Sequence, residues 1–421
     1  MPGIRAIRTY DRAWLAKDLI AGIVLCALLV PQGMAYAELA GLPAITGLYT
    51  TVVCLFAYAA LGPSPYLVLG PDSSLGPMIA AVILPLAAGD EAYAIALAGM
   101  LALLVGLICT GAGFARMGFI ADLLSAPVRV GYLAGLAVTI FVGQLPKLFG
   151  FSTDADSFMG EIVAFLQNLD QTNVYALAVG LLCLVIILGL KRRKPTWPGI
   201  LIAVLAAILI STVFDLAAKG VDTVGVLPQG FPAPSFPRVD LADIPVLAAA
   251  AIGISLVAIG DTISTSAGFA TRRGDEIDSD QEMVGIGAAN LGAGLFSGFP
   301  VSTSGSRTAV AEQSGAKTQL TGVVAGLLVL AMLLFVPGLV QNLPQPALAA
   351  IVITAAISLF DLPALRRLYT MRKSEFILAV VCALGVILVG VLEGIVIAVF
   401  VAILQFFARS WRPHMACLLY T

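Results

Sequence analysis

Long apolar stretches recur along nearly the whole chain, and short charged or Pro- and Gly-rich segments separate them. A helix needs about 20 consecutive, mostly apolar residues to cross the hydrocarbon core of a bilayer. The chain has 421 residues, of which 60% are hydrophobic and 11% are charged. A soluble domain, in contrast, carries about 25% charged residues. The sequence therefore predicts an integral membrane protein that crosses the bilayer many times.

The hydropathy pattern predicts an all-α protein with fourteen membrane segments. Their approximate ranges are 18–40, 42–62, 74–88, 92–113, 120–146, 172–190, 197–214, 243–265, 283–298, 304–314, 318–337, 346–360, 374–390 and 392–410. An even number of crossings places both termini on one side of the membrane. Lys and Arg concentrate in the cytoplasmic loops of membrane proteins. With both termini in the cytoplasm, 19 of the 23 Lys and Arg residues lie on that side, so the charges agree with the segment count.

The composition also disfavours several kinds of partner and site. The formal net charge is -2, so nothing in the sequence favours binding to nucleic acid. The single His, His414, lies in the C-terminal tail, and the six Cys are far apart, so we expect neither a metal or cofactor site nor an enzyme. We expect a multi-pass protein in the lipid bilayer of the plasma membrane, which in a prokaryote is the inner membrane.

Two of the fourteen segments, 74–88 and 304–314, are too short to cross the membrane as helices. Each follows a stretch rich in Gly, Pro and Ser, at 70–77 and 297–306. They are the third segment of the first seven and the third segment of the second seven. Because seven is an odd number of crossings, the two halves have opposite orientations. Paired short segments of this kind indicate a transporter with an inverted repeat and a site near the membrane midplane.

The starts of the two short segments form a candidate anion site. Free N–H groups and the helix dipole give a helix N-terminus a partial positive charge. Ser, Thr and Gly dominate both preceding stretches, and Arg307 is the one basic residue placed deep in a segment. An ionisable residue within the membrane is costly and indicates function. The Arg307 guanidinium either completes the anion site, forms a fixed ion pair with Glu312 or another buried acid, or extends to an interface.

Three acidic residues are predicted within the membrane and are candidates for coupling transport to an ion. Glu38 follows a Pro- and Gly-containing break at 30–33 in the first segment. Asp72 precedes the first short helix, and Asp261 lies late in the eighth segment. A buried carboxyl group beside an anion site can carry a proton. Asp261 and Thr265, four residues apart on one helical face, can instead bind a small cation through oxygen atoms, or Asp261 can simply cap its helix.

Several sequence blocks, in order over roughly residues 15–410, resemble one known family. They are Val30-Pro31-Gln32-Gly33-Met34-Ala35-Tyr36-Ala37, Ala40-Gly41-Leu42-Pro43, Gly47-Leu48-Tyr49-Thr50, Leu69-Gly70-Pro71, Asp280-Gln281-Glu282, Gly287-Ala288-Ala289-Asn290, Gly298-Phe299-Pro300, Ser306-Arg307-Thr308-Ala309-Val310 and Gln313-Ser314-Gly315-Ala316-Lys317-Thr318. Together these blocks resemble the SulP anion permeases, the sulfate-transporter family.

The resemblance implies a seven-plus-seven inverted repeat, shared with uracil permeases, that usually forms a homodimer. It also implies a core domain and a gate domain between cytoplasmic termini. The corresponding ranges are 18–115 and 243–340 for the core, 116–242 and 341–410 for the gate, and 1–17 and 411–421 for the termini. Matching positions place the substrate between the two short helices, at Gln32, Tyr36, Ser73, Ser306 and Arg307. Transport then moves this site across the membrane as the core moves against the gate.

The chain departs from the family pattern at two places. Members usually carry a cytoplasmic STAS domain after the last segment, and we expect none here because few residues follow 392–410. Many members have Glu where this chain has Asp261. The residues around Asp261 also resemble the sodium site of bicarbonate-transporting members, which implies a sodium site at Asp261, Thr265 and Thr303. The sequence is therefore compatible with either a proton or a sodium ion as the coupling ion.

The residues and the resemblance together predict secondary active transport of a small anion, such as sulfate, bicarbonate, chloride or a dicarboxylate. Proton-driven symport is the first hypothesis, and Glu38, Asp261 and Thr265 are the candidate coupling residues for a proton or a cation. Sodium-driven symport, anion exchange and a passive anion channel are the alternatives. A nucleobase permease would share the fold. Arg307 argues against it, because a neutral ring needs acids that accept its hydrogen bonds.

Overall fold

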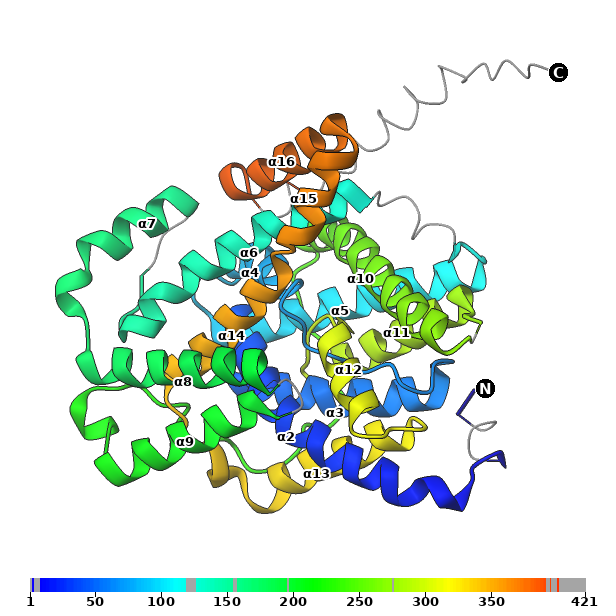
Figure 1. The fold of residues 1–421 in the computed structure, drawn as a ribbon, viewed down its shortest axis with the longest axis horizontal. Helices are drawn as coiled ribbons and strands as arrows, with labels where there is room; N and C mark the ends of the chain where they lie inside the picture. The colour runs from blue at the N-terminus through cyan, green and yellow to red at the C-terminus, as the bar shows by residue number, and fades with distance from the viewer. Residues whose placement is uncertain are drawn as a thin grey trace.

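The computed structural model describes residues 2–3, 8–118, 126–153, 157–194, 197–274, 276–390, 394 and 400. The described chain is mostly helical, and helices from the two halves of the sequence interleave (Figure 1). The predicted fourteenth segment at 392–410 and the tail at 411–421 lie outside the described residues, apart from Gly394 and Phe400.

Each of the other thirteen predicted segments contains a helix. In the first half these are α2 (Leu15–Leu39), α3 (Ala44–Leu61), α4 (Gly76–Ala87), α5 (Glu91–Phe114), α6 (Ala126–Phe149), α8 (Val174–Arg193) and α9 (Gly199–Phe214). In the second half they are α10 (Ile244–Arg273), α11 (Ser279–Leu295), α12 (Gly305–Gln313), α13 (Leu320–Phe335), α14 (Gln345–Leu359) and α16 (Lys373–Leu388). By length and composition, seven of the described helices can cross a membrane, and α4, α9 and α13 are apolar but shorter.

The connections contain elements that the hydropathy pattern does not predict. Among the described residues, one is a short apolar helix, α7 (Phe158–Gln167), and one is an amphipathic helix, α15 (Leu362–Met371). Four are single 3₁₀ turns: η1 (Arg12–Trp14), η3 (Leu169–Gln171), η4 (Ala217–Lys219) and η5 (Pro337–Val340). Two are short strands within the helical fold, β1 (Leu69–Gly70) and β2 (Ser302–Thr303).

Two predicted helix boundaries are wrong. α10 runs beyond the predicted 243–265 and ends where Gly274 adopts a positive φ of 75°, a conformation that Gly favours. α11 begins before the predicted 283–298, because the Asp278 side chain accepts a hydrogen bond from a backbone N–H of the first turn. Asp261 therefore lies within a long helix rather than near its end.

The helices pack in two groups, and each group contains helices from both halves of the chain. In the first group α5 packs along α10 and α11, and α13 packs against α2 and α3. In the second group α14 packs against α6 and α8, and α6 also packs against α16. Contacts between α2 and α14 join the groups. The groups contain helices from the ranges predicted as core and gate, and that division stays a prediction.

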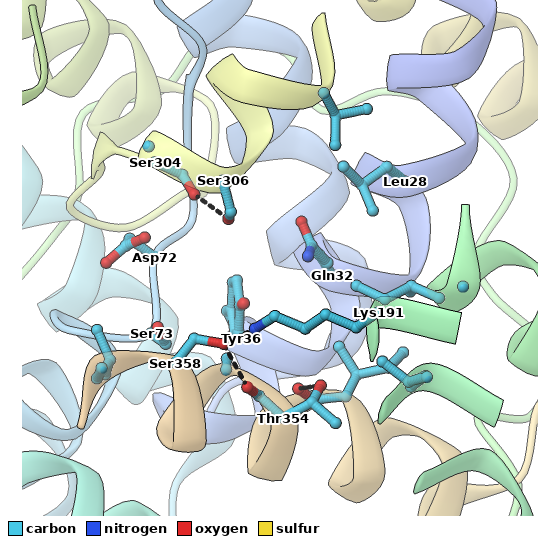
Figure 2. Close-up of a pocket in the computed structure, with 18 of the residues that line it drawn as sticks. Leu28, Gln32, Tyr36, Asp72, Ser73, Lys191, Ser304, Ser306, Thr354 and Ser358 are labelled. Atoms are coloured by element: carbon cyan, nitrogen blue, oxygen red, sulfur yellow. Dashed lines mark hydrogen bonds between the residues drawn. The ribbon is translucent and has the colours of Figure 1, made fainter. Parts of the chain in front are cut away.

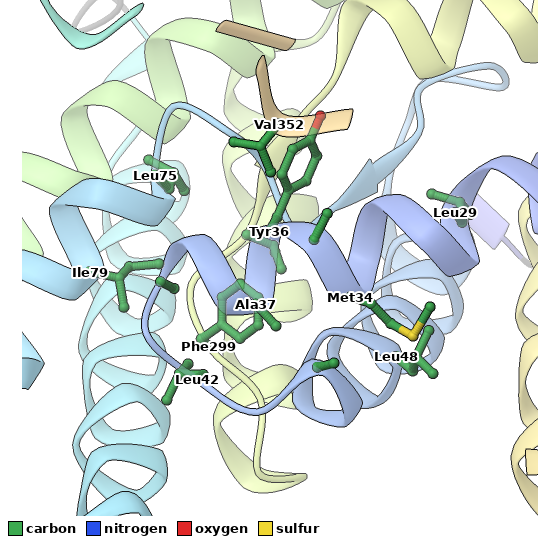
Figure 3. Packing of buried hydrophobic residues seen from close by; sticks show 14 of the residues in the cluster. Leu29, Met34, Tyr36, Ala37, Leu42, Leu48, Leu75, Ile79, Phe299 and Val352 are labelled. Atoms are coloured by element: carbon green, nitrogen blue, oxygen red, sulfur yellow. The ribbon is translucent and has the colours of Figure 1, made fainter. Parts of the chain in front are cut away.

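The middle of α2 is tightly packed against α3. α2 stays helical through the predicted break at 30–33, with Pro31 inside the helix. Gly33 on α2 and Gly47 on α3 lie so close that a Cβ atom on Gly47 would overlap the Gly33 carbonyl. Figure 3 shows buried apolar side chains around this part of α2, among them Met34, Ala37, Leu48 and Phe299. This packing holds the turn of α2 that carries two of the predicted site residues.

We predict that Gly47→Ala destabilises the protein, because the added methyl group overlaps backbone that can move only if α2 shifts. Overpacking of this kind costs about 1–3 kcal/mol. The matched control is Gly111→Ala in α5, where nothing lies within 4 Å of the added Cβ atom. That change should be neutral or stabilising, since Ala favours a helix over Gly by about 1 kcal/mol. Thermal unfolding in detergent measures both, and equal melting temperatures would contradict the prediction.

Candidate functional site

The two Gly- and Ser-rich stretches meet in a short antiparallel ladder. The residues of β1 pair with those of β2, Leu69 with Thr303 and Gly70 with Ser302. Extended backbone cannot face lipid, because its polar groups would have no partners. The ladder supplies those partners from within the protein. It also places the chain that precedes α4 beside the chain that precedes α12.

A cavity of about 410 Å³ lies where these stretches face α2, α8 and α14 (Figure 2). Its apolar wall includes Leu28, Leu133, Ile187 and Ile351. Its polar and charged lining residues are Gln32, Tyr36, Asp72, Ser73, Ser74, Lys191, Asp261, Thr265, Thr303, Ser304, Ser306, Thr354 and Ser358. An apolar pocket with a few convergent polar groups is the usual form of a site for a small ligand.

Four of the five predicted substrate-binding residues line this cavity. Gln32, Tyr36 and Ser73 are each 5% exposed. Ser306 lies in the first turn of α12, with its hydroxyl 3.0 Å from that of Ser304. The Gln32 Oε1 atom is buried and has no hydrogen-bond partner among the described residues. Buried polar atoms are normally paired, so Gln32 is available to a ligand.

Arg307, the fifth predicted residue, is fully buried but does not line the cavity. Its Nη2 atom donates to the Pro71 carbonyl at 2.6 Å and lies 3.6 Å from Asp72 Oδ1. The guanidinium also lies against Gly70, where a Cβ atom would come within 2.6 Å of Nη1. The acid beside Arg307 is thus Asp72. The positive charge of Arg307 lies directly behind the stretch that forms one wall of the cavity.

Asp72 and Asp261 both line the cavity, and Ser74 lies between them. The Ser74 Oγ atom lies 2.6 Å from Asp72 Oδ2 and 3.4 Å from Asp261 Oδ2. Thr265 and Thr303 also line the cavity. The structure therefore brings the three residues of the predicted sodium site together with a second carboxyl group. A proton or cation held there would offset the negative charge of an anion in the same cavity.

Glu38 lies apart from this cavity. Its Oε1 atom accepts a hydrogen bond from Gln345 Nε2 at 2.8 Å. Glu38 is close to the end of α2, and Gln345 is the first residue of α14, so this bond joins the two packing groups. The structure does not bring Glu38 together with Asp261, the other predicted acid for coupling.

The sequence pattern does not identify the polar residues that α8 and α14 contribute to the cavity. It places Lys191 in a basic run at the cytoplasmic end of a segment, whereas the structure places this residue in the cavity wall. The Lys191 Nζ atom donates to Ser358 Oγ at 2.8 Å, and Ser358 lies one turn after Thr354 on α14. Only the packing of α8 on α14 distinguishes Lys191 from the basic residues that follow it.

A further buried acid, Glu282 in α11, also lies outside the predicted site. It is 1% exposed, and its carboxylate accepts hydrogen bonds from the Tyr58 and Ser266 hydroxyls, each at 2.6 Å. These bonds link α3, α10 and α11. The sequence does not reveal these two hydrogen bonds, because Tyr58 lies far from Glu282 along the chain and Ser266 lies on a separate helix, α10.

Buried polar side chains hold the extended stretch before α12 in place. The fully buried Asn290 in α11 accepts from the Val301 N–H at 2.9 Å and donates to the Val301 carbonyl at 3.2 Å. The Thr50 hydroxyl in α3 accepts from the Phe299 N–H at 3.2 Å. These side chains replace the hydrogen bonds that a continuous helix would form. They fix the position of the α12 N-terminus relative to α3 and α11.

The arrangement can bind a small anion. The N-termini of α4 and α12 favour negative charge, and the Ser73 and Ser306 hydroxyls can donate to it. Arg307 adds a buried positive charge that Asp72 partly offsets. Because both extended stretches contribute, an anion bound between Ser73 and Ser306 would contact both halves of the chain.

Comparisons of the sequence with known proteins agree on one family. A model of the sulfate permease family matches residues 15–383. A probable sulfate transporter of Mycobacterium tuberculosis is 42% identical over 413 residues, which are 98% of this chain and 74% of that protein. A chloroplastic sulfate transporter of Arabidopsis thaliana is 33% identical over 99% of this chain and 62% of its own length.

Two solved structures have a similar fold. Mouse solute carrier 26 family member A9, an anion transporter in an inward-facing state, matches with a TM-score of 0.90 and 25% identity over 97% of this chain and 71% of its own. The transmembrane domain of a cyanobacterial bicarbonate transporter matches with a TM-score of 0.81 and 21% identity over 94% of this chain and 98% of its own.

The fold and the cavity define a multi-pass membrane transporter with two short helices at its centre. The chain belongs to the sulfate permease family. The predicted family and the predicted inverted-repeat fold are therefore confirmed, and the protein is a transporter rather than an enzyme.

We predict that Asn290→Leu, a change that keeps the number and branching of the side-chain heavy atoms, destabilises the protein and weakens ligand binding. It leaves the N–H and carbonyl of Val301 without their side-chain partner, and each unpaired buried group costs about 1–3 kcal/mol. Asn168→Leu, at the end of α7 and away from the cavity, is the control. Melting temperature and equilibrium binding of radiolabelled sulfate measure the effects. A variant that melts like the parent would contradict the role given to Asn290.

Proposed function

We propose that the protein is a secondary active transporter of small anions, with sulfate as the first candidate substrate. The observation that carries this proposal is the cavity between the starts of α4 and α12, where Gln32, Ser73 and Ser306 lie in front of the buried Arg307. Two helix N-termini with hydroxyl donors suit an oxyanion. Membership of the sulfate permease family supports the same class of substrate.

We further propose that transport works by alternating access. The core, with α2 to α5 and α10 to α13, carries the substrate site, and the gate, with α6 to α9, α14 and α16, moves against it. The position of the cavity supports this mechanism, because residues of both helix groups line it. The Glu38–Gln345 hydrogen bond between the groups would have to break during such a movement.

Proton-driven symport is the first form of coupling that we propose. Asp261 lies in the same cavity as the substrate residues, and Asp72 lies across the Ser74 hydroxyl from it. A carboxyl group at this position can bind a proton together with the anion and release it on the other side. Glu38 is the second candidate proton carrier, because it lies where the two helix groups meet.

Sodium-driven symport is the alternative that a specific observation favours. Asp261, Thr265 and Thr303 line one cavity although they come from α10 and β2. The Thr303 hydroxyl lies 2.9 Å from that of Thr262, which holds β2 against α10. Oxygen atoms from a carboxylate and hydroxyl groups suit a small hard cation.

We also propose that the protein acts as a homodimer in the plasma membrane, the inner membrane of a bacterium, with both termini in the cytoplasm. The distribution of Lys and Arg along the sequence supports this orientation. The dimer is what the family resemblance implies.

Proteoliposomes that contain the protein should take up radiolabelled sulfate, and Arg307→Ala should weaken binding about tenfold or more. The reason is that the buried charge of Arg307 attracts an anion through the cavity wall and its guanidinium holds the Pro71 carbonyl of that wall; a tenfold loss corresponds to about 1.4 kcal/mol. Arg238→Ala, at an exposed loop position, is the control for loss of one basic residue. Absence of uptake of sulfate, bicarbonate, chloride and dicarboxylate under every ion gradient would overturn the proposed function. Unchanged binding in Arg307→Ala would place the anion site elsewhere.

Imposing proton, sodium and counter-anion gradients separately should identify the coupling ion. An acidic exterior should accelerate uptake by the parent, and Asp261→Asn should abolish that acceleration because an amide cannot carry the proton. Glu38→Gln conserves size and tests the second carrier in the same assay. Sodium coupling would replace proton coupling if uptake depends on the sodium gradient and not on the proton gradient. In that case Asp261→Asn and Thr265→Val should each abolish the sodium-driven uptake. Acceleration only by internal anion would indicate exchange.

A further inference from the structure

The cavity carries a cationic side chain on the wall that faces the two short helices. Lys191 belongs to the last turn of α8, and its Nζ atom donates to Ser358 Oγ on α14 at 2.8 Å. Figure 2 shows the Lys191 side chain extending from α8 into the cavity. Ser73 and Ser306 line the same cavity from the stretches before α4 and at the start of α12.

The charges of the cavity wall give Lys191 a clear electrostatic role. Among the described residues that line the cavity, Lys191 has the only cationic side chain, whereas Asp72 and Asp261 are acidic. Arg307 lies behind the wall and is 3.6 Å from Asp72. An anion that enters therefore approaches two carboxyl groups. A cation in the cavity itself raises the local concentration of anions and offsets this repulsion.

The amino group of Lys191 is available for a ligand. A lysine ammonium has three N–H donors, and the hydrogen bond to Ser358 uses one of them. This partner is a neutral hydroxyl group, so an anion can compete for the ammonium. Lys191 is itself solvent-exposed, as are Arg192, Arg193 and Lys194, but these three residues do not line the cavity. The Lys194 Nζ atom lies over the Trp197 ring, 4.6 Å from its centroid.

We propose that Lys191 is a substrate-binding residue that contacts the anion from the α8–α14 side of the cavity. Ser73 and Ser306 hold the anion from the side of the short helices, so the bound anion bridges the two helix groups. Because α8 and α14 move relative to the short helices in alternating access, Lys191 contacts the anion in only part of the transport cycle. This inference rests on the proposed function of anion transport and names a further residue for it.

A contact between Lys191 and the anion also affects selectivity between anions of different charge. The attraction between an ammonium group and an anion scales with the charge of the anion. Lys191 therefore favours divalent anions such as sulfate over monovalent anions such as chloride. Donors from the two short helices are neutral groups with partial charges, so they discriminate less. Loss of Lys191 should reduce the preference for divalent anions as well as the affinity.

Equilibrium binding of radiolabelled sulfate and chloride to purified protein tests the inference. Lys191→Met removes the charge and keeps the length of the side chain, and should weaken sulfate binding about tenfold, as expected for one hydrogen bond to a charged group. Chloride binding should weaken less. Lys191→Arg should restore most of the sulfate affinity, because it keeps the charge. Arg192→Met removes a neighbouring charge outside the cavity and should bind like the parent.

Each other outcome is decisive as well. Sulfate binding by Lys191→Met that equals the parent's overturns the inference. Equal losses for sulfate and chloride together with a lowered melting temperature also overturn it, because they indicate a structural role for Lys191. If Arg192→Met loses as much sulfate affinity as Lys191→Met, the effect comes from the general positive charge of this helix end and not from a contact with Lys191. A parent protein that binds no anion would instead overturn the proposed function, and that result differs from all the others.

Discussion

A backbone N–H or carbonyl group without a partner costs several kcal/mol inside hydrocarbon, of order 4–8 by transfer to an apolar solvent. The rest of this structure depends on how the chain meets that constraint at its two extended stretches. β1 and β2 pair with each other, Asn290 pairs with Val301, and the Arg307 guanidinium donates to the Pro71 carbonyl. The β1–β2 pairing and the bond from Arg307 to Pro71 join the first half of the chain to the second half. They also leave two helix N-termini at one cavity.

The distribution of charge around that cavity follows from the same arrangement. Arg307 is placed behind the wall because its guanidinium is needed by the extended backbone and by Asp72. Asp261 and Asp72 lie in the cavity with Ser74 between them. Lys191 comes from the opposite side, on a helix of the other packing group. The proposed anion site, the proposed site of the coupling ion and helices of both packing groups thus meet at one cavity, as the proposed secondary active transport requires.

Much of the fold could be predicted from the sequence because a bilayer imposes a simple rule on length and hydropathy. The thirteen described segments follow from apolar runs, and the two short helices follow from the Gly- and Ser-rich stretches before them. The rule fails where contacts with neighbouring residues decide whether the backbone is helical. Pro31 is tolerated inside α2, and α10 extends through polar residues to Gly274. α15 is amphipathic and α7 has only 10 residues, so a search for long apolar runs finds neither helix.

The sequence by itself predicted the membrane class, the inverted repeat, the family and eight residues that line the cavity: Gln32, Tyr36, Asp72, Ser73, Asp261, Thr265, Thr303 and Ser306. The membrane class and the inverted repeat follow from composition and spacing. The family and the substrate-binding positions follow from the resemblance of the sequence motifs to that family. Only the tertiary structure decided that Arg307 lies behind the cavity, that Glu38 bonds to Gln345, and that Lys191 lines the cavity. The physical reason is that these positions depend on contacts between helices distant in sequence, and charge alone does not reveal which partner a side chain finds.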